Sequence, residues 1–186
     1  MQLTTQHGIS AGGDVAGGSI HKTTNIIAAR QNHIAILYEK FRAEAENISD
    51  AEKHFIEDLQ HYIDRPAAQI VRTLREKLVE SGRADLVDDA EAAKERAMKR
   101  IVRFQTSQTA QEIFAYTLGE LHSRFKHHVR PLIAKGASRE VIDAAVYGEV
   151  LHPVVSSAEP SDLGMNPTMV EAFLYFLAGN CHIRWD

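Results

Sequence analysis

The side chains best suited to chemistry lie near the end of the sequence, where Cys181 stands beside His182. A thiol next to an imidazole could belong to a nucleophile–base pair or to a metal site. A nucleophilic cysteine also needs a third group that orients the base, and zinc needs about four ligands. His122 and His152 could supply a base, but nothing in their spacing selects either. We therefore expect no catalytic residue, no metal and no cofactor.

The same closing stretch is better explained as part of the core. Its apolar helix is followed by residues that favour helix C-termini. We expect the thiol to be buried, the imidazole to be hydrogen-bonded, and the single tryptophan to pack on the helical body together with Ile183. The predicted structural motif at the C-terminus consists of Gly179, Asn180, Cys181, His182 and Trp185.

A glycine-rich stretch near the start raises the question of phosphate binding. It reads AGGDVAGGSIHK over residues 11–22, with four glycines within seven residues. A P-loop carries a lysine directly after its last glycine and follows a buried strand. Ser19 stands where that lysine is needed, Lys22 comes too late, and the dinucleotide fingerprint G-x-G-x-x-G does not fit either. The spacing argues against a nucleotide site.

A five-residue repeat explains these glycines better. Each unit carries a glycine, then Asp or Ser, then Val or Ile. Glycine permits tight turns, and β-branched residues suit extended, packed positions. We expect this arm to pair, in a β-like way, with copies from other chains or with the helical body; a leader without fixed structure is the alternative. The residues assigned to self-association are Gly12, Gly13, Asp14, Val15, Gly17, Gly18 and Ile20.

A small basic spot lies in the middle of the second half, where Lys126 and two histidines precede Arg130. Such residues most often form a solvated helix face. As an alternative they form an anion site, which would make the protein a small-ligand or nucleic-acid sensor. The net charge of −4 gives no general attraction for nucleic acid, so we do not expect that partner. The candidate anion site consists of His127, His128, Arg130 and Arg184.

Acidic and basic residues alternate between residues 85 and 104. The carboxylates of Asp88, Asp89 and Glu91 stand among lysines and arginines. Glu95 and Lys99 have the four-residue spacing of a helical ion pair. This pattern is typical of a solvated helix face and not of the carboxylate pair of a glycosidase.

These side chains must be positioned by helices, because apolar residues recur every three or four positions from about residue 34. We predict a mainly α protein, a multi-helix globular bundle with a short glycine-rich arm. The arm covers residues 1–30 and the helical domain residues 31–186. Three prolines and a glycine predict a loop over residues 152–168. Helical patterns cover residues 85–104, 107–132, 138–150 and 167–178, besides shorter ones before residue 82.

Composition places the chain among ordinary globular proteins, with 44% hydrophobic and 25% charged residues. One cysteine excludes an internal disulfide and fits a reducing compartment. No apolar run approaches the ~18 residues of a membrane span, and the N-terminus has no signal-peptide pattern. We expect a cytoplasmic protein without a membrane partner.

The two unusual ends also carry a resemblance. GGDVAGGSI, a helical start IAILYEKFRAE and a closing FLYFLAGNCHIRW resemble the C-terminal domain of bacterial ABC-three-component systems. IEDLQHYID, LREKLVESGRADLVDDAEAAKERAMKRI and FKHHVRPLIAKG follow the same pattern in order. The resemblance covers about residues 11–186, and GNCHIRW is its most specific part.

The resemblance implies a role in antiviral defence and other bacterial conflicts. It implies an ABC-type ATPase, a small middle component and an effector as partners, and a domain that couples the effector to them without catalysing a reaction. The glycine stretch begins within a dozen residues of Met1, which suggests a stand-alone subunit or a piece of a larger protein. Gly18-Ser19 departs from the related stretches, which often carry a charged residue and Asp there. We expect a non-enzymatic interaction module that also self-associates into a homo-oligomer.

Overall fold

The computed structural model describes residues 23–45, 55–64 and 72–185, with side chains from His33 onward. All regular structure in this part of the chain is helical, which confirms the mainly α prediction. The helices are α1 (Thr23–Ala45), α2 (Glu57–Ile63), α3 (Leu74–Glu80), η1 (Ala84–Leu86), α4 (Val87–Arg103), α5 (Gln108–Arg124), η2 (Phe125–Val129), α6 (Arg130–Ala134), α7 (Arg139–Ala145), η3 (Val146–Leu151), α8 (His152–Ser157) and α9 (Pro167–Gly179).

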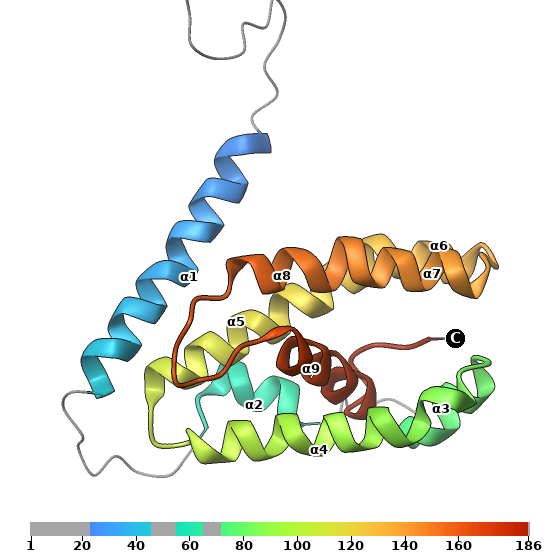
Figure 1. The fold of residues 1–186 in the computed structure, drawn as a ribbon, viewed down its shortest axis with the longest axis horizontal. Coiled ribbons are helices and arrows are strands. Elements are labelled where there is room, and N and C mark those ends of the chain that lie inside the picture. The colour runs from blue at the N-terminus through green and yellow to red at the C-terminus, as the bar shows by residue number, and fades with distance from the viewer. Residues whose placement is uncertain (1–22, 46–54, 65–71, 186) are drawn as a thin grey trace, which may run out of the picture.

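Helix α9 forms the centre of the bundle. It starts at Asn166, whose side chain accepts a hydrogen bond from the Met169 amide at 2.9 Å, with Pro167 in the first turn. Its side chains are buried on nearly every face, as expected of a helix that is apolar all round. It packs most extensively on α4 and also contacts α3, α5 and α8 (Figure 1).

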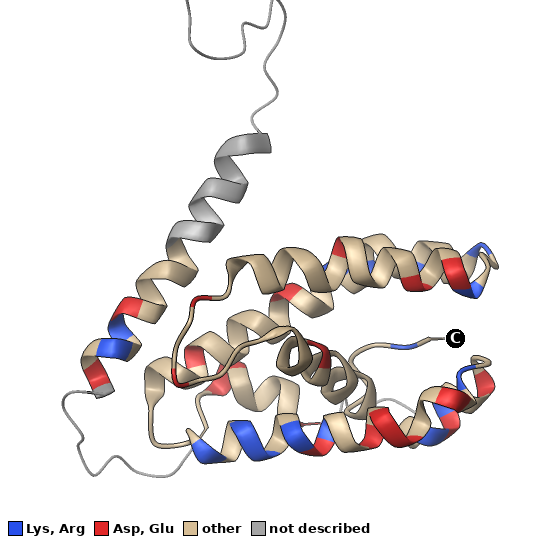
Figure 2. Ribbon diagram, viewed as in Figure 1, with Lys and Arg blue, Asp and Glu red and all other residues tan. Residues whose placement is uncertain are grey.

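Helix α4 covers α9 with a row of small residues. Ala90, Ala93 and Ala97 are buried together with Val87 and Ile101, at the spacing of one helical face. Alanine has a short side chain, so the two helices approach closely. The opposite face of α4 is charged, acidic in its first half and basic in its second (Figure 2).

Helix α1 packs on α5 and begins earlier than the sequence predicts. Ile34, Leu37, Tyr38 and Phe41 are all buried, as their spacing indicates. The helix starts at Thr23, inside the segment assigned to the arm of residues 1–30. The self-association residues Gly12, Gly13, Asp14, Val15, Gly17, Gly18 and Ile20 lie outside the described residues.

Two long helices form an antiparallel pair, one from α5 through η2 to α6 and the other from α7 through η3 to α8 (Figure 1). Each contains one π-helical stretch, and the two stretches contact each other. The Arg130 amide donates to the Phe125 carbonyl, and the His152 amide donates to the Tyr147 carbonyl, both five residues back. The wide π-helical turn lets each helix continue past the proline that lies two residues after it, Pro131 in one helix and Pro153 in the other.

The predicted loop over residues 152–168 is wrong in its first part, because residues 152–157 form α8 and Pro153 lies in its first turn. Pro153 has no amide hydrogen for the carbonyl four residues back, which belongs to Glu149. Arg124 Nη1 donates to that carbonyl at 3.3 Å and satisfies it from the neighbouring helix. The irregular segment is therefore confined to residues 158–166.

Candidate functional site

The closing segment, residues 180–185, leaves α9 through a Schellman turn. The His182 amide donates to the Leu177 carbonyl at 2.9 Å, and the Cys181 amide donates to the Ala178 carbonyl at 3.3 Å. Cys181 has φ of +67°, a conformation that costs a residue with a β-carbon roughly 1 kcal/mol or more. Glycine usually occupies this place. A cysteine there indicates that its side chain makes contacts that offset the strain.

That contact is with Lys77, a lysine that is only 2% exposed. Its Nζ donates to the Ala178 carbonyl at 2.6 Å and lies 3.1 Å from Cys181 Sγ. A cation at the last carbonyls of a helix is favourable, because those carbonyls form the negative end of the helix dipole. Lys77 therefore joins α3 to the end of α9 and to the thiol.

Asn180 is the C-cap of α9, as predicted, whereas Gly179 has a different role. Gly179 is the last residue of α9, and a Cβ there would lie 2.6 Å from Lys94 Cδ. The lack of a side chain at Gly179 therefore leaves room for Lys94. The left-handed backbone conformation, for which glycine is usually needed, is found at Cys181 instead. Asn180 is the C-cap and its Nδ2 donates to the Tyr62 carbonyl at 3.1 Å.

The end of the segment is anchored by Trp185, which is 6% exposed. Its ring meets Phe125 edge to face at 5.1 Å, and the guanidinium carbon of Arg83 lies 4.9 Å from the ring centroid. Arg83 is itself buried and pairs with Asp143 at 2.9 Å. Ile183 is buried too, so the predicted packing of both residues on the helical body is confirmed.

Three histidines and a tyrosine gather where the segment passes α2 and α5. The ring of His182 lies 5.4 Å from those of His61 and Tyr62 and 6.2 Å from that of His122. His182 Nε2 is 3.0 Å from the Asp64 carbonyl, the hydrogen bond expected for this residue. Burial lowers the pKa of His122, with contributions from the charges of Lys126 and His61. Burial also lowers the pKa of His182, against the opposing effect of its hydrogen bond to Asp64.

A pocket of about 210 Å³ opens between the closing segment and the α5–η2–α6 helix. Of the four residues of the predicted anion site, Arg130 and Arg184 line it. His127 and His128 do not; His128 Nδ1 instead lies 4.0 Å from a Glu149 carboxylate oxygen. The full lining consists of His122, Phe125, Lys126, Arg130, Cys181, His182, Ile183 and Arg184.

The arrangement offers little for nucleophilic or metal chemistry. Cys181 is 4% exposed, and its thiol contacts the ammonium of Lys77 and not an imidazole among the described residues. Within residues 23–45, 55–64 and 72–185, no three His, Cys, Asp or Glu side chains are placed to hold a metal ion. What the pocket does present is a set of hydrogen-bond donors with positive charge.

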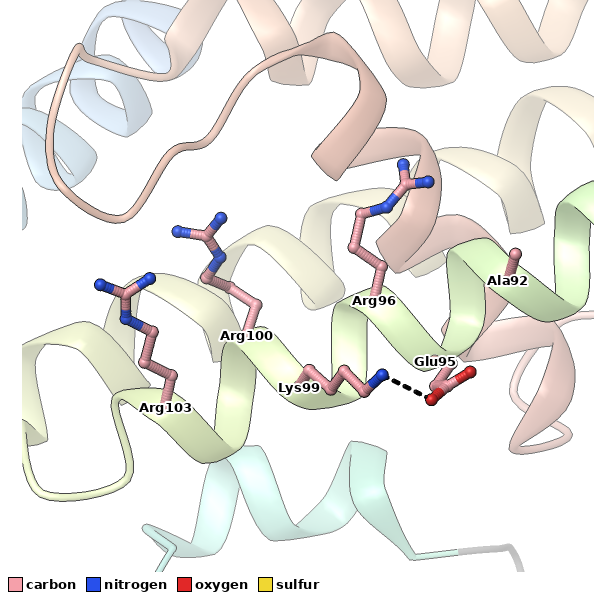
Figure 3. A pocket seen from close by; sticks show the side chains of 6 residues that line it. All are labelled: Ala92, Glu95, Arg96, Lys99, Arg100 and Arg103. Atoms are coloured by element: carbon pink, nitrogen blue, oxygen red, sulfur yellow. Dashed lines mark ion pairs between the residues drawn. The ribbon is translucent and has the colours of Figure 1, made fainter.

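A second basic surface lies on the outer face of α4. It is an open groove of about 370 Å³, lined by Ala92, Glu95, Arg96, Lys99, Arg100 and Arg103. Figure 3 shows the guanidinium groups of Arg96, Arg100 and Arg103 extending from α4 in the same direction. The predicted ion pair of Lys99 with Glu95 is present at 2.6 Å. We call this surface the arginine groove.

Of the arginines in the groove, Arg100 contacts the loop between α8 and α9. Arg100 Nη1 donates weakly to the Asp162 carbonyl at 3.4 Å, and its guanidinium lies against Gly164. Arg103 lies over the ring of Phe104 at 5.7 Å. Arg96 and Arg103 form no ion pair with any other residue that the structure describes. The groove therefore carries uncompensated positive charge on a molecule that is acidic overall.

Several residues of both surfaces were missed by reading the sequence. Arg130 was predicted and Lys126 was named beside it, but His122 was not assigned to the anion site. His122, Lys126 and Arg130 are spaced four residues apart, which places them on one helix face, and the neighbouring histidine pair obscured this. Arg96, Arg100 and Arg103 have a similar spacing and were assigned only to a solvated face. Lys77 and Arg83 gave no signal, because lysine and arginine are almost never fully buried.

Comparison with known proteins identifies one family. The model of C-terminal domain 9 of the ABC-three component (ABC-3C) systems matches residues 73–185, from the start of α3 to Trp185. No curated protein and no solved structure is similar enough to be matched. None of the helices in the described part of the chain has the length and apolar character to cross a membrane.

Proposed function

Because the chain belongs to the C-terminal domain 9 family of the ABC-three component systems, we propose that it is a non-enzymatic interaction module. In this proposal it couples an effector to an ABC-type ATPase and a middle component of the same antiviral defence system. The matched region comprises the α4–α9 core, the closing segment and the arginine groove. Its helices pack around one buried core, which is suited to presenting a surface.

The observation that carries the proposal is the arginine groove. Three guanidinium groups extend from one face of a helix into an open groove (Figure 3). Guanidinium binds carboxylates with two parallel hydrogen bonds and is enriched at protein interfaces. By charge complementarity, the occupant is an acidic segment of one of the other two components. Charged residues at such a rim speed association and select the partner.

Reconstitution with an ABC-type ATPase and a middle component of the same system tests this role. Each is mixed with the chain, and the dissociation constant is measured at low and high salt. We expect Arg96→Glu/Arg103→Glu to weaken the complex by about 1–3 kcal/mol, roughly 5- to 150-fold, since each reversal replaces attraction by repulsion. Binding of the unaltered chain weakens with salt as the charges are screened.

A double reversal elsewhere serves as the matched control. Lys40 on α1 and Lys135 after α6 are exposed lysines outside the groove. Lys40→Glu/Lys135→Glu changes the net charge equally and is expected to leave the dissociation constant within about twofold. Equal loss in both double variants, or no complex with either component, contradicts the proposal. Tight binding of an RNA or DNA oligonucleotide in the groove would do so as well.

We propose further that the N-terminal arm makes the protein a homo-oligomer. Support comes from the repeated Gly-polar-β-branched unit at residues 13–22, which cannot bury an apolar face alone. Light scattering after size exclusion compares the full chain with a variant that lacks residues 1–22 and keeps α1 intact. Identical monomers would end this part of the proposal without touching the groove.

A further inference from the structure

The pocket beside the closing segment combines three cations with no counter-ion in the described structure. Lys126 and Arg130 reach it from the η2–α6 helix, and Arg184 reaches it from the closing segment. No ion pair joins any of the three to another residue among those described. Like charges that converge on a concavity raise its potential and attract an anion. The acidic composition of the chain makes this local excess more notable.

The remaining walls favour a small and strongly charged group. His122 can donate a ring N–H, whereas the N–H of His182 is already donated to the Asp64 carbonyl, and Phe125 and Ile183 add apolar surface to the lining. Cys181 also lines the pocket, and its sulfur lies 3.1 Å from Lys77 Nζ, which adds a further positive charge nearby. Charge-assisted hydrogen bonds in such partly dry surroundings are roughly twice as strong as neutral ones.

We propose that this pocket binds a phosphate group, either as the free ion or as the terminal group of a small phosphomonoester. The two negative charges of phosphate suit a site with more cations than a single carboxylate can pair. Its volume of about 210 Å³ is below the ~300 Å³ at which pockets for drug-sized ligands begin. It therefore has room for a phosphate with a small attached group and is too small for a drug-sized ligand.

This inference goes beyond the coupling role and uses a different surface. The arginine groove lies on α4, whereas the phosphate pocket is formed by α5, η2, α6 and the closing segment. The groove is larger and more open, as a protein segment requires. The pocket is smaller and more enclosed, as a small ion requires. Loss of one function is thus expected without loss of the other.

Titration with inorganic phosphate and with a phosphomonoester tests the site on the full chain. Binding is followed by calorimetry at low ionic strength and by the NMR signals of the His122 and His182 rings, which line the pocket. We expect saturable binding of one equivalent and shifts of these two rings. Lys126→Gln/Arg130→Gln should weaken binding at least tenfold, and Arg184→Gln at least threefold. Lys40→Gln/Lys135→Gln, which removes two exposed cations elsewhere, should change it less than twofold.

The arms of the experiment separate the sources of the anion. Tighter binding of the phosphomonoester identifies an organic phosphate as the ligand, and equal binding identifies the free ion. Chloride at matched ionic strength must leave the ring signals unchanged. Equal weakening in both double variants, absence of saturation up to millimolar phosphate, or ring shifts with chloride alone would overturn the site. Retained component binding in Lys126→Gln/Arg130→Gln keeps this result distinct from that of the groove.

Discussion

Replacement of Trp185 by alanine tests how firmly the closing segment holds the bundle together. Truncation of a buried tryptophan typically costs about 3–5 kcal/mol. The indole Nε1 of Trp185 is buried with no hydrogen-bond partner in the described structure, so its removal returns about 1 kcal/mol. We therefore expect Trp185→Ala to lower the free energy of unfolding by about 2–4 kcal/mol. The corresponding fall in Tm is roughly 5–15 °C for a chain of this size.

Urea unfolding followed by far-ultraviolet circular dichroism measures this change, because the variant lacks the only tryptophan. Trp185→Phe keeps an aromatic ring against Phe125 and Arg83 and is expected to recover more than half of the loss. Arg184→Ala, in the same segment but exposed, should stay within about 0.5 kcal/mol of the unaltered chain. A Trp185→Ala variant as stable as Arg184→Ala would refute the anchoring role. Removal of residues 180–186 should cost at least as much as Trp185→Ala.

Three further perturbations follow from the geometry. Cys181→Gly should be at least as stable as Cys181→Ala in urea unfolding, because both variants lose the contact with Lys77 and glycine also relieves the strain at φ +67°. Inside a helix or strand, alanine is the more stable of the two by ~0.5–1 kcal/mol. That order at residue 181 would contradict the Schellman turn. Burial lowers the pKa of His122 and His182, so the unfolded chain binds more protons than the folded one. The contribution of the two histidines to stability is complete above the unfolded pKa and is lost as the pH falls through the folded pKa values. Stability measured by denaturation should therefore decline from pH 7 to pH 5, and less so in His122→Gln/His182→Gln; an identical slope in that variant would count against the burial of these rings. Gly164→Ala, at φ +61° and against the Arg100 guanidinium, should lower the free energy of unfolding by about 1–2 kcal/mol, whereas Gly179→Ala should cost less, because its neighbour is the flexible end of Lys94.

The helices themselves were largely predictable, because helices such as α1 and α4 bury one face and α9 is apolar all round. The stripes on α1 and α4 and the apolar α9 follow the periodicity of the sequence closely. The C-terminal packing of Ile183 and Trp185 was also predictable, since large apolar residues near a helix end usually return to the core. These predictions rest on local spacing and on the hydrophobic effect, which a single sequence displays directly.

What escaped prediction depends on contacts between distant segments. Pro153 read as a loop residue, since nothing local shows that Arg124 satisfies the Glu149 carbonyl. The histidine pair at residues 127 and 128 was assigned to the anion site, but the π-helical stretch there changes which residues face the pocket. The buried position of Lys77 depends on the end of α9, about a hundred residues later. Such contacts are fixed by the tertiary fold and do not change the spacing of apolar residues in the sequence.

The paired π-helical stretches bear on how related chains are to be compared. Each wide turn holds one residue more than an α-helical turn, and one residue of an α-helix corresponds to about 100° of rotation. A relative that is one residue shorter at η2 would carry its counterpart of Arg130 on another side of the helix. Gaps of a single position are thus expected at η2 and η3, and an alignment that places them elsewhere would pair residues that do not occupy the same site.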